Sequence, residues 1–370
     1  MIDQDNIESV SGLGAMQRGM VFDHALDPRS DAYVEQFDLR ARGEVEENAL
    51  RDALVATSRH FSVLRTVFSF RNTDDPYQIV LRDRRPPLEV VDLTGRLDPD
   101  AALEAVKRED RSRGFNLSSD PLLRCTVVRL GPGRTHLLLT FHHVILDGWS
   151  LAPLFITLFS YYEEIRRTGT WHQGIEDRPY LDYVAWCENQ SDVRAREFWT
   201  EEIGDYQEPT GIHADLGGEG FKAANHTFAL GEALTARMND VAVAHRLTPS
   251  TIFLAAWGLV LQRFNYAEDA VFGAVVSGRG IALEGIESMV GLFVNTQLVR
   301  VFAGADETFV DVARRVQTNH HRATEHAWFP LHEVLGVSPL RGALIDHVVA
   351  FENYPLSEQL QSFDGDGGSL

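Results

Sequence analysis

The chain has 370 residues, a formal net charge of −20, 44% hydrophobic residues and 24% charged residues. This composition is that of an ordinary globular protein, long enough for one to three domains with large cores. The acidic balance argues against general nucleic-acid binding, which relies on lysine and arginine to neutralise phosphates.

The location of the protein and its metal content are predicted from patterns that the sequence lacks. No apolar run approaches the ~18 residues that cross a bilayer, and the acidic start MIDQDNIESV is unlike a signal peptide. Two cysteines, Cys125 and Cys187, are too few for a disulfide scaffold or a cysteine-rich zinc site. We therefore expect a cytoplasmic protein with no membrane partner, no nucleic-acid partner and no bound metal.

Strand and helix patterns alternate along the first half of the chain. Alternating or continuous apolar residues predict strands, and apolar residues at helical spacing predict helices. The predicted strands are 32–43, 63–70, 77–81, 88–93, 123–130 and 135–143, and the predicted helices are 45–61, 98–113 and one that begins at 151. The last two strands pair across the turn GPGR.

A polar stretch from Arg166 to Pro179 separates this half from a second one of the same character. In the second half the same patterns predict further helices and strands. The helices are 191–203, 232–245, 248–264 and 309–323, and the strands are 270–278, 292–302 and 345–354. The predicted fold class is α/β (α+β), with one lobe at 1–175 and a second at 176–370.

The stretch FHHVILDGWS follows a predicted strand and carries the strongest functional signal. Histidine is the usual proton-transfer group near neutrality, and catalytic groups favour strand ends. Because successive strand residues point to opposite faces, only one of His142 and His143 can face a shared cleft, and the other is buried. Asp147 and Gly148 predict a tight turn that the aspartate anchors. Ser150 is interpreted as a helix-start residue, since the chain has no G-x-S-x-G nucleophile elbow.

This stretch resembles the H-H-x-x-x-D-G signature of condensation domains from nonribosomal peptide synthetases. Other motifs of that family recur in the same order across essentially the whole chain. They are LGAMQRGMVF at 13–22, RHFSVLRTVF at 59–68, YLDYVAW at 180–186, VGLFVNTQLVR at 290–300 and LIDHVVAFENYP at 344–355. The chain departs from the pattern at Gly14, Ala15, Phe61 and Ala327, none of which is the proton-transfer group. It ends soon after the last motif, where family members continue, so an incomplete second lobe is expected.

The resemblance implies two chloramphenicol-acetyltransferase-like lobes in a V shape, with a tunnel between them. Donor and acceptor peptidyl carrier proteins would deliver thioesters into the tunnel on phosphopantetheine arms, and an adenylation domain would be an adjacent partner. The acceptor amine would attack the donor thioester and form an amide. The chain is thus predicted to be an acyltransferase that binds no cofactor directly.

The resemblance also assigns roles within the site. His143 is the implied catalytic residue, as a base or as a hydrogen-bonding group that positions the reactants. His142 is expected to point into the first lobe. Arg65, in the LRT of the second motif, is expected to form a structural ion pair with Asp147.

Residues that would line the substrate tunnel come from both lobes. Trp149 of the signature stretch is one candidate, and Ser277 and Asn295 are candidates from the second lobe. The alternative for Ser277 and Asn295 is that they cap strands or turns.

Two alternative functions remain open. An epimerisation domain of the same superfamily shares the double histidine, although QRGMVF and LDGWS are closer to the condensation branch, especially to members that accept a D-configured donor. A non-catalytic docking module typically lacks the second histidine, which this chain has as His143.

Overall fold

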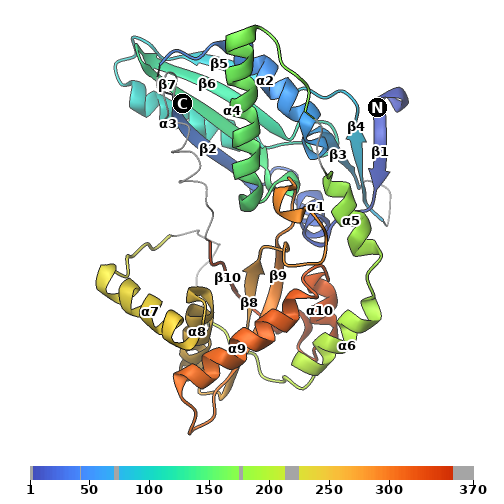
Figure 1. The fold of residues 1–370 in the computed structure, drawn as a ribbon, viewed down its shortest axis with the longest axis vertical. Coiled ribbons are helices and arrows are strands. Elements are labelled where there is room, and N and C mark those ends of the chain that lie inside the picture. The colour runs from blue at the N-terminus through green and yellow to red at the C-terminus, as the bar shows by residue number, and fades with distance from the viewer. Residues whose placement is uncertain (1–2, 42, 71–74, 175–177, 213–224, 353–370) are drawn as a thin grey trace. The chain divides into compact units, whose positions relative to one another are not determined.

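The computed structural model describes residues 3–41, 43–70, 75–174, 178–212 and 225–352 (Figure 1). Helices and strands alternate throughout, so the predicted mixed α/β class is confirmed. No helix within those ranges is long and apolar enough to cross a bilayer. Residues 353–370, which include the last three residues of the LIDHVVAFENYP motif, lie outside the described residues.

The chain divides into two compact units. The first contains the residues up to Gln190 together with Ala282–Phe293. The second contains Ser191–Ile281 and Val294–Glu352. The first unit contains two sheets and the second contains one, and each unit has its own helices.

The first unit is built on a four-stranded sheet in the order β2-β7-β6-β5 and a three-stranded sheet in the order β1-β4-β3. Among the described strands of this unit, β5 and β6 pair in parallel and the other neighbours are antiparallel. The strands are β1 (Ile7–Ser11), β2 (Val34–Ala41), β3 (Thr66–Ser69), β4 (Tyr77–Leu81), β5 (Leu88–Asp92), β6 (Leu123–Gly131) and β7 (Arg134–His142). The helices are α1 (Ala15–Leu26), α2 (Glu47–His60), α3 (Pro99–Ser112), α4 (Leu151–Thr168) and α5 (Tyr180–Glu188).

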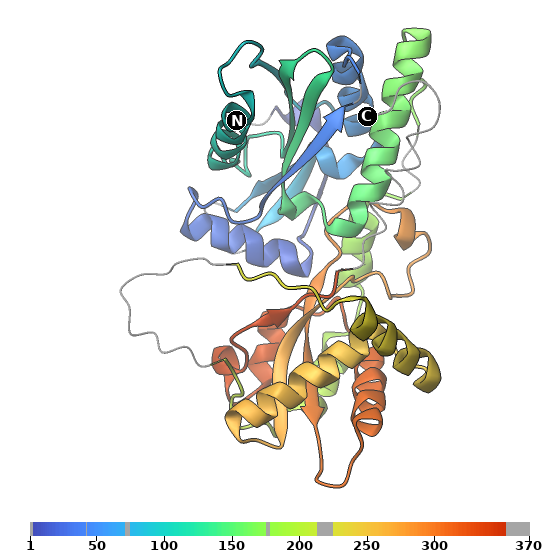
Figure 2. The same cartoon turned by 90° about the vertical axis from the view of Figure 1, so that its left-hand side faces the viewer.

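Strands β6 and β7 are buried along almost their whole length because helices cover both faces of the sheet. Figure 2 shows α3, in teal, on one side of the sheet and α4, in green, on the other. Leu103 of α3 packs against Val128 and Leu138, while the ring of Phe155 of α4 lies 5.9 Å from that of Phe37 on β2. Strands buried on both faces read as continuous apolar runs, as THLLLTF does here.

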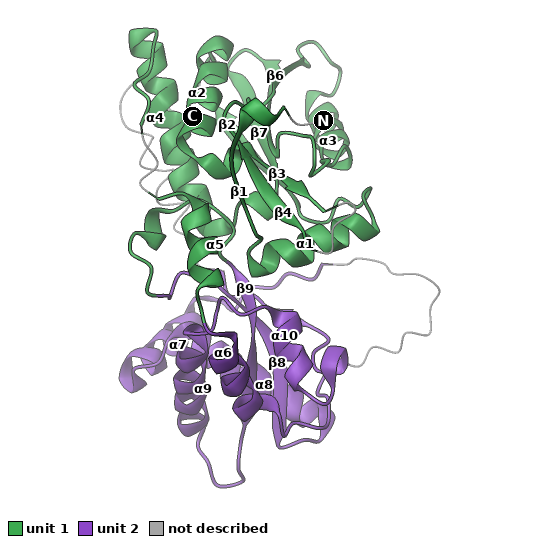
Figure 3. Ribbon diagram, turned by 90° about the vertical axis from the view of Figure 1, so that its right-hand side faces the viewer, with its two compact units in different colours: residues 1–190, 282–293, 353–370 green, residues 191–281, 294–352 purple. Residues whose placement is uncertain are grey.

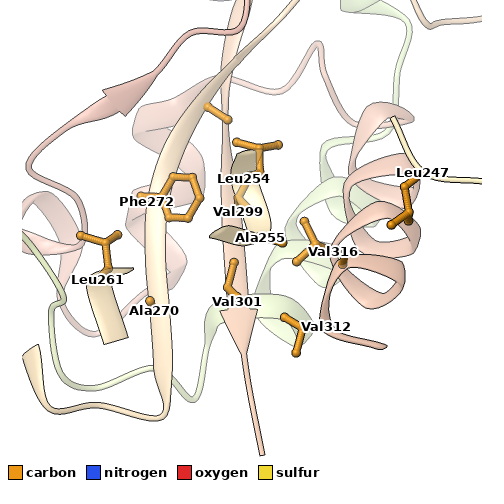
Figure 4. Packing of buried hydrophobic residues seen from close by; sticks show 12 residues of the cluster. Leu247, Leu254, Ala255, Leu261, Ala270, Phe272, Val299, Val301, Val312 and Val316 are labelled. Carbon is orange, nitrogen blue, oxygen red and sulfur yellow. The ribbon is translucent and has the colours of Figure 1, made fainter. Parts of the chain in front are cut away.

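The second unit has a three-stranded sheet in the order β10-β8-β9. Its elements are α6 (Asp192–Ile203), α7 (Glu232–His245), α8 (Pro249–Asn265), β8 (Asp269–Val276), β9 (Asn295–Phe302), α9 (Phe309–Thr324), α10 (Leu331–Val337) and β10 (Val348–Val349). Its core gathers side chains of α8, α9 and the two long strands. Phe272 of β8 lies between Leu261 and Leu254 of α8, and Val301 of β9 and Val316 of α9 belong to the same cluster (Figure 4).

Most predicted elements are confirmed, and the exceptions have local causes. The strand predicted at 63–70 begins only at Thr66, because Ser62–Arg65 forms a 3-10 turn. The strand predicted at 292–302 begins at Asn295, because Leu292 and Phe293 belong to the first unit. The strand predicted at 345–354 is reduced to β10 within the described residues.

The segment Ala282–Phe293 belongs to the first unit although it lies beyond residue 176 (Figure 3). Tyr180 is 1% exposed, its hydroxyl donates to the carbonyl of Leu292 at 2.8 Å, and its ring lies 5.3 Å from that of Phe293. A Cβ atom at Gly291 would stand 2.1 Å from the Tyr180 ring, so only glycine permits this approach. The lobe boundary predicted between residues 175 and 176 is therefore corrected: α5 and this segment pack with the first unit.

The contact between Gly291 and Tyr180 gives a stability prediction. Gly291→Ala should lower the free energy of unfolding by about 1–3 kcal/mol, the usual cost of overpacking a buried site. Gly19→Ala is the matched control. Gly19 lies inside α1, and apart from its own helix backbone no atom would lie within 4 Å of an added Cβ. Alanine should therefore stabilise the protein by about 0.5–1 kcal/mol. Chemical denaturation of both variants checks this, and a Gly291→Ala protein as stable as wild type would contradict it.

Candidate active site

The two histidines stand where the central strand β7 ends. His142 is its last residue and lies opposite Val34 of β2. His143 opens a short 3-10 turn, His143–Ile145, and its backbone N–H donates to the carbonyl of Tyr33 at 2.7 Å. Pairing on both sides of β7 thus fixes the backbone that carries the pair.

His142 is the buried member of the pair, at 2% exposure. Its Nδ1 accepts a hydrogen bond from the backbone N–H of Val144 at 3.1 Å, so the proton of the neutral ring lies on Nε2. The rings of His24, Tyr33 and Phe115 surround it. Burial, together with repulsion from His24 and His143, lowers the pKa of His142 to about 3. His142 is therefore neutral and structural at physiological pH.

His143 differs from its neighbour in exposure and in bonding. Its side chain is half-buried, and its Nδ1 has no hydrogen-bond partner among the described residues. A buried polar atom without a hydrogen-bond partner is uncommon in native proteins and can indicate a functional role. Of the two imidazoles, only that of His143 combines partial exposure with a ring nitrogen that no described residue uses.

Gln17 supports the turn that follows the histidines, a role that the sequence reasoning missed. It is fully buried on α1, its Nε2 donates to the carbonyl of Val144 at 3.1 Å, and its Oε1 accepts from the backbone N–H of Gly14 at 3.0 Å. The signal that could have found it is a glutamine inside the apolar motif LGAMQRGMVF.

Asp147 is 1% exposed and ties the signature loop to the segment Ala282–Phe293. Its Oδ1 accepts from the backbone N–H of Ser150 at 2.9 Å, and its Oδ2 accepts from the backbone N–H of Phe293 at 2.9 Å. Its own N–H donates to the carbonyl of Gly291 at 3.0 Å. A carboxylate bound to backbone N–H groups in this way is an anchor for the loop.

The predicted ion pair between Asp147 and Arg65 is wrong. Arg65 is buried in the turn before β3, where its guanidinium is used by other groups. Its Nε donates to the carbonyl of Ser58 at 2.9 Å, and the same side chain binds Glu8 of β1 and the carbonyl of Leu81 of β4. Arg65 therefore joins α2 to the three-stranded sheet.

The rest of the signature forms the start of α4. Gly148–Ser150 is a 3-10 turn that contains the half-buried Trp149. Ser150 occupies the N-cap position of α4, but its hydroxyl makes no cap bond. That hydroxyl instead lies 2.8 Å from Asp147 Oδ1 and from the carbonyl of Gly291, and it accepts from the N–H of Gly291 at 3.0 Å.

Ser277 and Asn295 belong to the second unit. Asn295 is 2% exposed, and its amide donates to the carbonyls of Ala327 and Phe329 at 2.8 and 2.9 Å. It therefore ties the start of β9 to the carbonyls of Ala327 and Phe329. That Asn295 lines a substrate tunnel stays a prediction. Ser277 is half-buried, and its Oγ accepts from the backbone N–H of Arg279 at 3.3 Å.

The anchoring role of Asp147 leads to a prediction about stability. Asp147→Ala leaves two buried backbone N–H groups without this acceptor and should destabilise the protein by about 3–5 kcal/mol. Asp147→Asn retains one acceptor oxygen and should cost less. Because Arg65 has different partners, the effect of Arg65→Lys should add to that of Asp147→Asn in a double-mutant cycle. A coupling free energy of about 1 kcal/mol between the two substitutions would instead support the predicted ion pair between Asp147 and Arg65.

The depressed pKa of His142 gives a prediction about acid stability. The unfolded chain protonates this histidine near pH 6.5, whereas the folded protein does so only near pH 3. Stability is therefore lost as the pH falls through this window, by about 1.4 kcal/mol per pH unit. His142→Asn keeps an acceptor for Val144 but does not titrate. The free energy of unfolding of this variant should therefore fall less steeply with falling pH than that of the wild type, by about 1.4 kcal/mol per pH unit. Denaturation curves between pH 6 and pH 4 measure both slopes, and equal slopes would refute the assignment.

The comparisons with known proteins agree along the whole chain. The Condensation domain family model matches residues 7–366. The chain is 35% identical over 355 residues to bacitracin synthase 3 of Bacillus licheniformis and 34% identical over 366 residues to surfactin synthase subunit 2 of Bacillus subtilis. These matches cover 95% and 98% of this chain, but the chain spans only 6% and 10% of the length of those two relatives.

Solved structures show the same fold. The first condensation domain of the CDA synthetase matches with a TM-score of 0.73 at 23% identity, over 94% of this chain and 83% of that one. The starter condensation domain of rhizomide synthetase matches with a TM-score of 0.74 at 20% identity, over 92% and 78%. The resemblance carried by FHHVILDGWS and the accompanying motifs is thus confirmed: the chain belongs to the condensation-domain family of nonribosomal peptide synthetases.

Proposed function

We propose that this domain joins a donor acyl or peptidyl thioester to the amine of an acceptor aminoacyl thioester, each borne on the phosphopantetheine arm of a peptidyl carrier protein. The amine nitrogen attacks the thioester carbonyl carbon, a C–N bond forms, and the C–S bond breaks. The donor thiol leaves with the proton that the amine gives up. The adjacent partner is an adenylation domain, which supplies the activated amino acid.

The observation that carries this proposal is the different state of the two histidines. His142 is buried and neutral, whereas His143 is half-buried with an Nδ1 that no described residue bonds. A thioester is already activated, so binding both arms together supplies much of the rate by proximity. One placed imidazole can then accept the proton of the amine or hydrogen-bond the reacting groups.

The nucleophilic side chains near the signature do not favour a covalent mechanism. Ser150 is fully buried, and its hydroxyl is engaged by Asp147 and Gly291. Burial raises the pKa of Cys125 to about 12 and that of Cys187 to about 12, so both are thiols at neutral pH. Direct attack of one substrate on the other needs none of them.

Substitution of His143 tests the proposal. His143→Ala should lower the rate of amide formation between two loaded carrier proteins by about 10²-fold or more, the usual scale for a general acid–base group. Carrier affinity should stay nearly unchanged, because the backbone that holds the loop is intact. His172→Ala is the matched control: His172 is a highly exposed histidine of the same unit and should leave the rate unchanged.

Rapid-quench measurements under single-turnover conditions, with mass detection of the product, distinguish the outcomes. A His143→Ala protein that condensed both carriers at the wild-type rate, with chemistry rate-limiting, would remove His143 from the mechanism. Inversion of the donor α-carbon without amide formation would identify the epimerisation alternative. Binding of carriers with neither reaction would identify the docking module.

A further inference from the structure

Tyr33 has an unusual backbone conformation next to the histidines. Its φ is 67°, in the left-handed region that bulky residues avoid. Arg246 and Tyr266 have a similar φ, but each is a helix C-cap, where this conformation is common. Tyr33 instead lies in a turn closed by the N–H of Val34, which donates to the carbonyl of Asp31 at 3.1 Å. Such strain persists only where the surroundings hold it.

A carboxylate on α1 holds the Tyr33 side chain. The phenol donates a hydrogen bond to Asp23 Oδ2 at 2.6 Å, and Asp23 lies in the last turn of that helix. Burial and the neighbouring Asp23 raise the pKa of Tyr33 to about 12. The hydroxyl therefore remains a donor at every pH at which a general base of ordinary pKa would act.

The main chain of Tyr33 holds His143 in turn. Its carbonyl accepts from the N–H of His143 at 2.7 Å, which extends the pairing of β2 and β7 one step beyond the last pair, Val34 with His142. The Tyr33 ring also lies 6.1 Å from the ring of His142. Asp23, Tyr33 and His143 thus form a continuous chain of contacts from α1 to the residue after the central strand.

We propose that Asp23 and Tyr33 are positioning residues for His143. This inference depends on the proposed function, because it assumes that the His143 imidazole acts on the reactants. The phenol–carboxylate bond fixes the strained turn, and the turn carbonyl fixes the backbone from which the imidazole projects. Loss of that bond lets the turn relax, and the imidazole is displaced from the place that the reaction needs.

Three variants and one control test the inference. Tyr33→Phe removes only the hydroxyl, Asp23→Ala removes its acceptor, and the double variant removes both. Each should lower kcat for condensation about tenfold with KM for both carriers unchanged, since small displacements of a placed group cost rates of this order. The double variant should be no slower than either single variant. Glu35→Ala, at an exposed acid two residues farther along, should have no effect.

Hydrogen exchange at the His143 amide provides a readout that does not require activity. Its protection should fall in the three variants and stay unchanged in Glu35→Ala, with thermal midpoints near wild type. Unchanged kcat, unchanged His143 protection, a loss confined to thermal stability, or additive losses in the double variant would each overturn the inference. If the wild-type domain forms no amide, the proposed function fails. Hydrogen exchange at the His143 amide then decides by itself whether the Asp23–Tyr33 pair holds the His143 backbone. Unchanged protection in the three variants would refute the positioning role.

Discussion

The carboxylate of Asp147 is the contact on which the geometry of the candidate site depends. It accepts the N–H of Ser150 three residues ahead and the N–H of Phe293, 146 residues farther along the chain. The loop from His142 to Ser150 is therefore fixed at one end by β7 and at the other by a segment from the far half of the sequence. The aspartate of the H-H-x-x-x-D-G signature thus places the loop, and the proposed function assigns the chemistry to His143 of the same loop.

Adjacent residues of one type acquire opposite properties here because a strand ends between them. His142 still belongs to β7 and is enclosed by aromatic rings, where an imidazolium would lose its hydration without gaining a counter-ion. His143 is already in the following turn and keeps part of its surface exposed. The two adjacent histidines are therefore not equivalent: His142 is a buried, neutral part of β7, and His143 is a half-buried residue of the turn that follows.

Local patterns predicted much of this molecule, and contacts between distant residues account for most of what they missed. Periodicity placed the helix at 232–245 and the hairpin of β6 and β7, because each depends on neighbours in the sequence. It could not give the partner of Arg65, which is Glu8, 57 residues away. Nor could it show that the Asn295 amide donates to the carbonyl of Phe329 or that Tyr33 adopts a left-handed backbone. A motif states which residue types recur, whereas their bonding depends on the topology that brings them together.

The insertion of Ala282–Phe293 into the first unit constrains how halves of such domains can be recombined. A chimera joined near residue 190 would take its first half from one parent and this segment from the other. The fully buried Phe293 would then have to pack against a foreign Tyr180 and Tyr183, and the glycine beside them would have to match a foreign ring. A workable exchange unit is therefore discontinuous in sequence: it transfers 282–293 together with the first 190 residues, so that one parent supplies both sides of that packing.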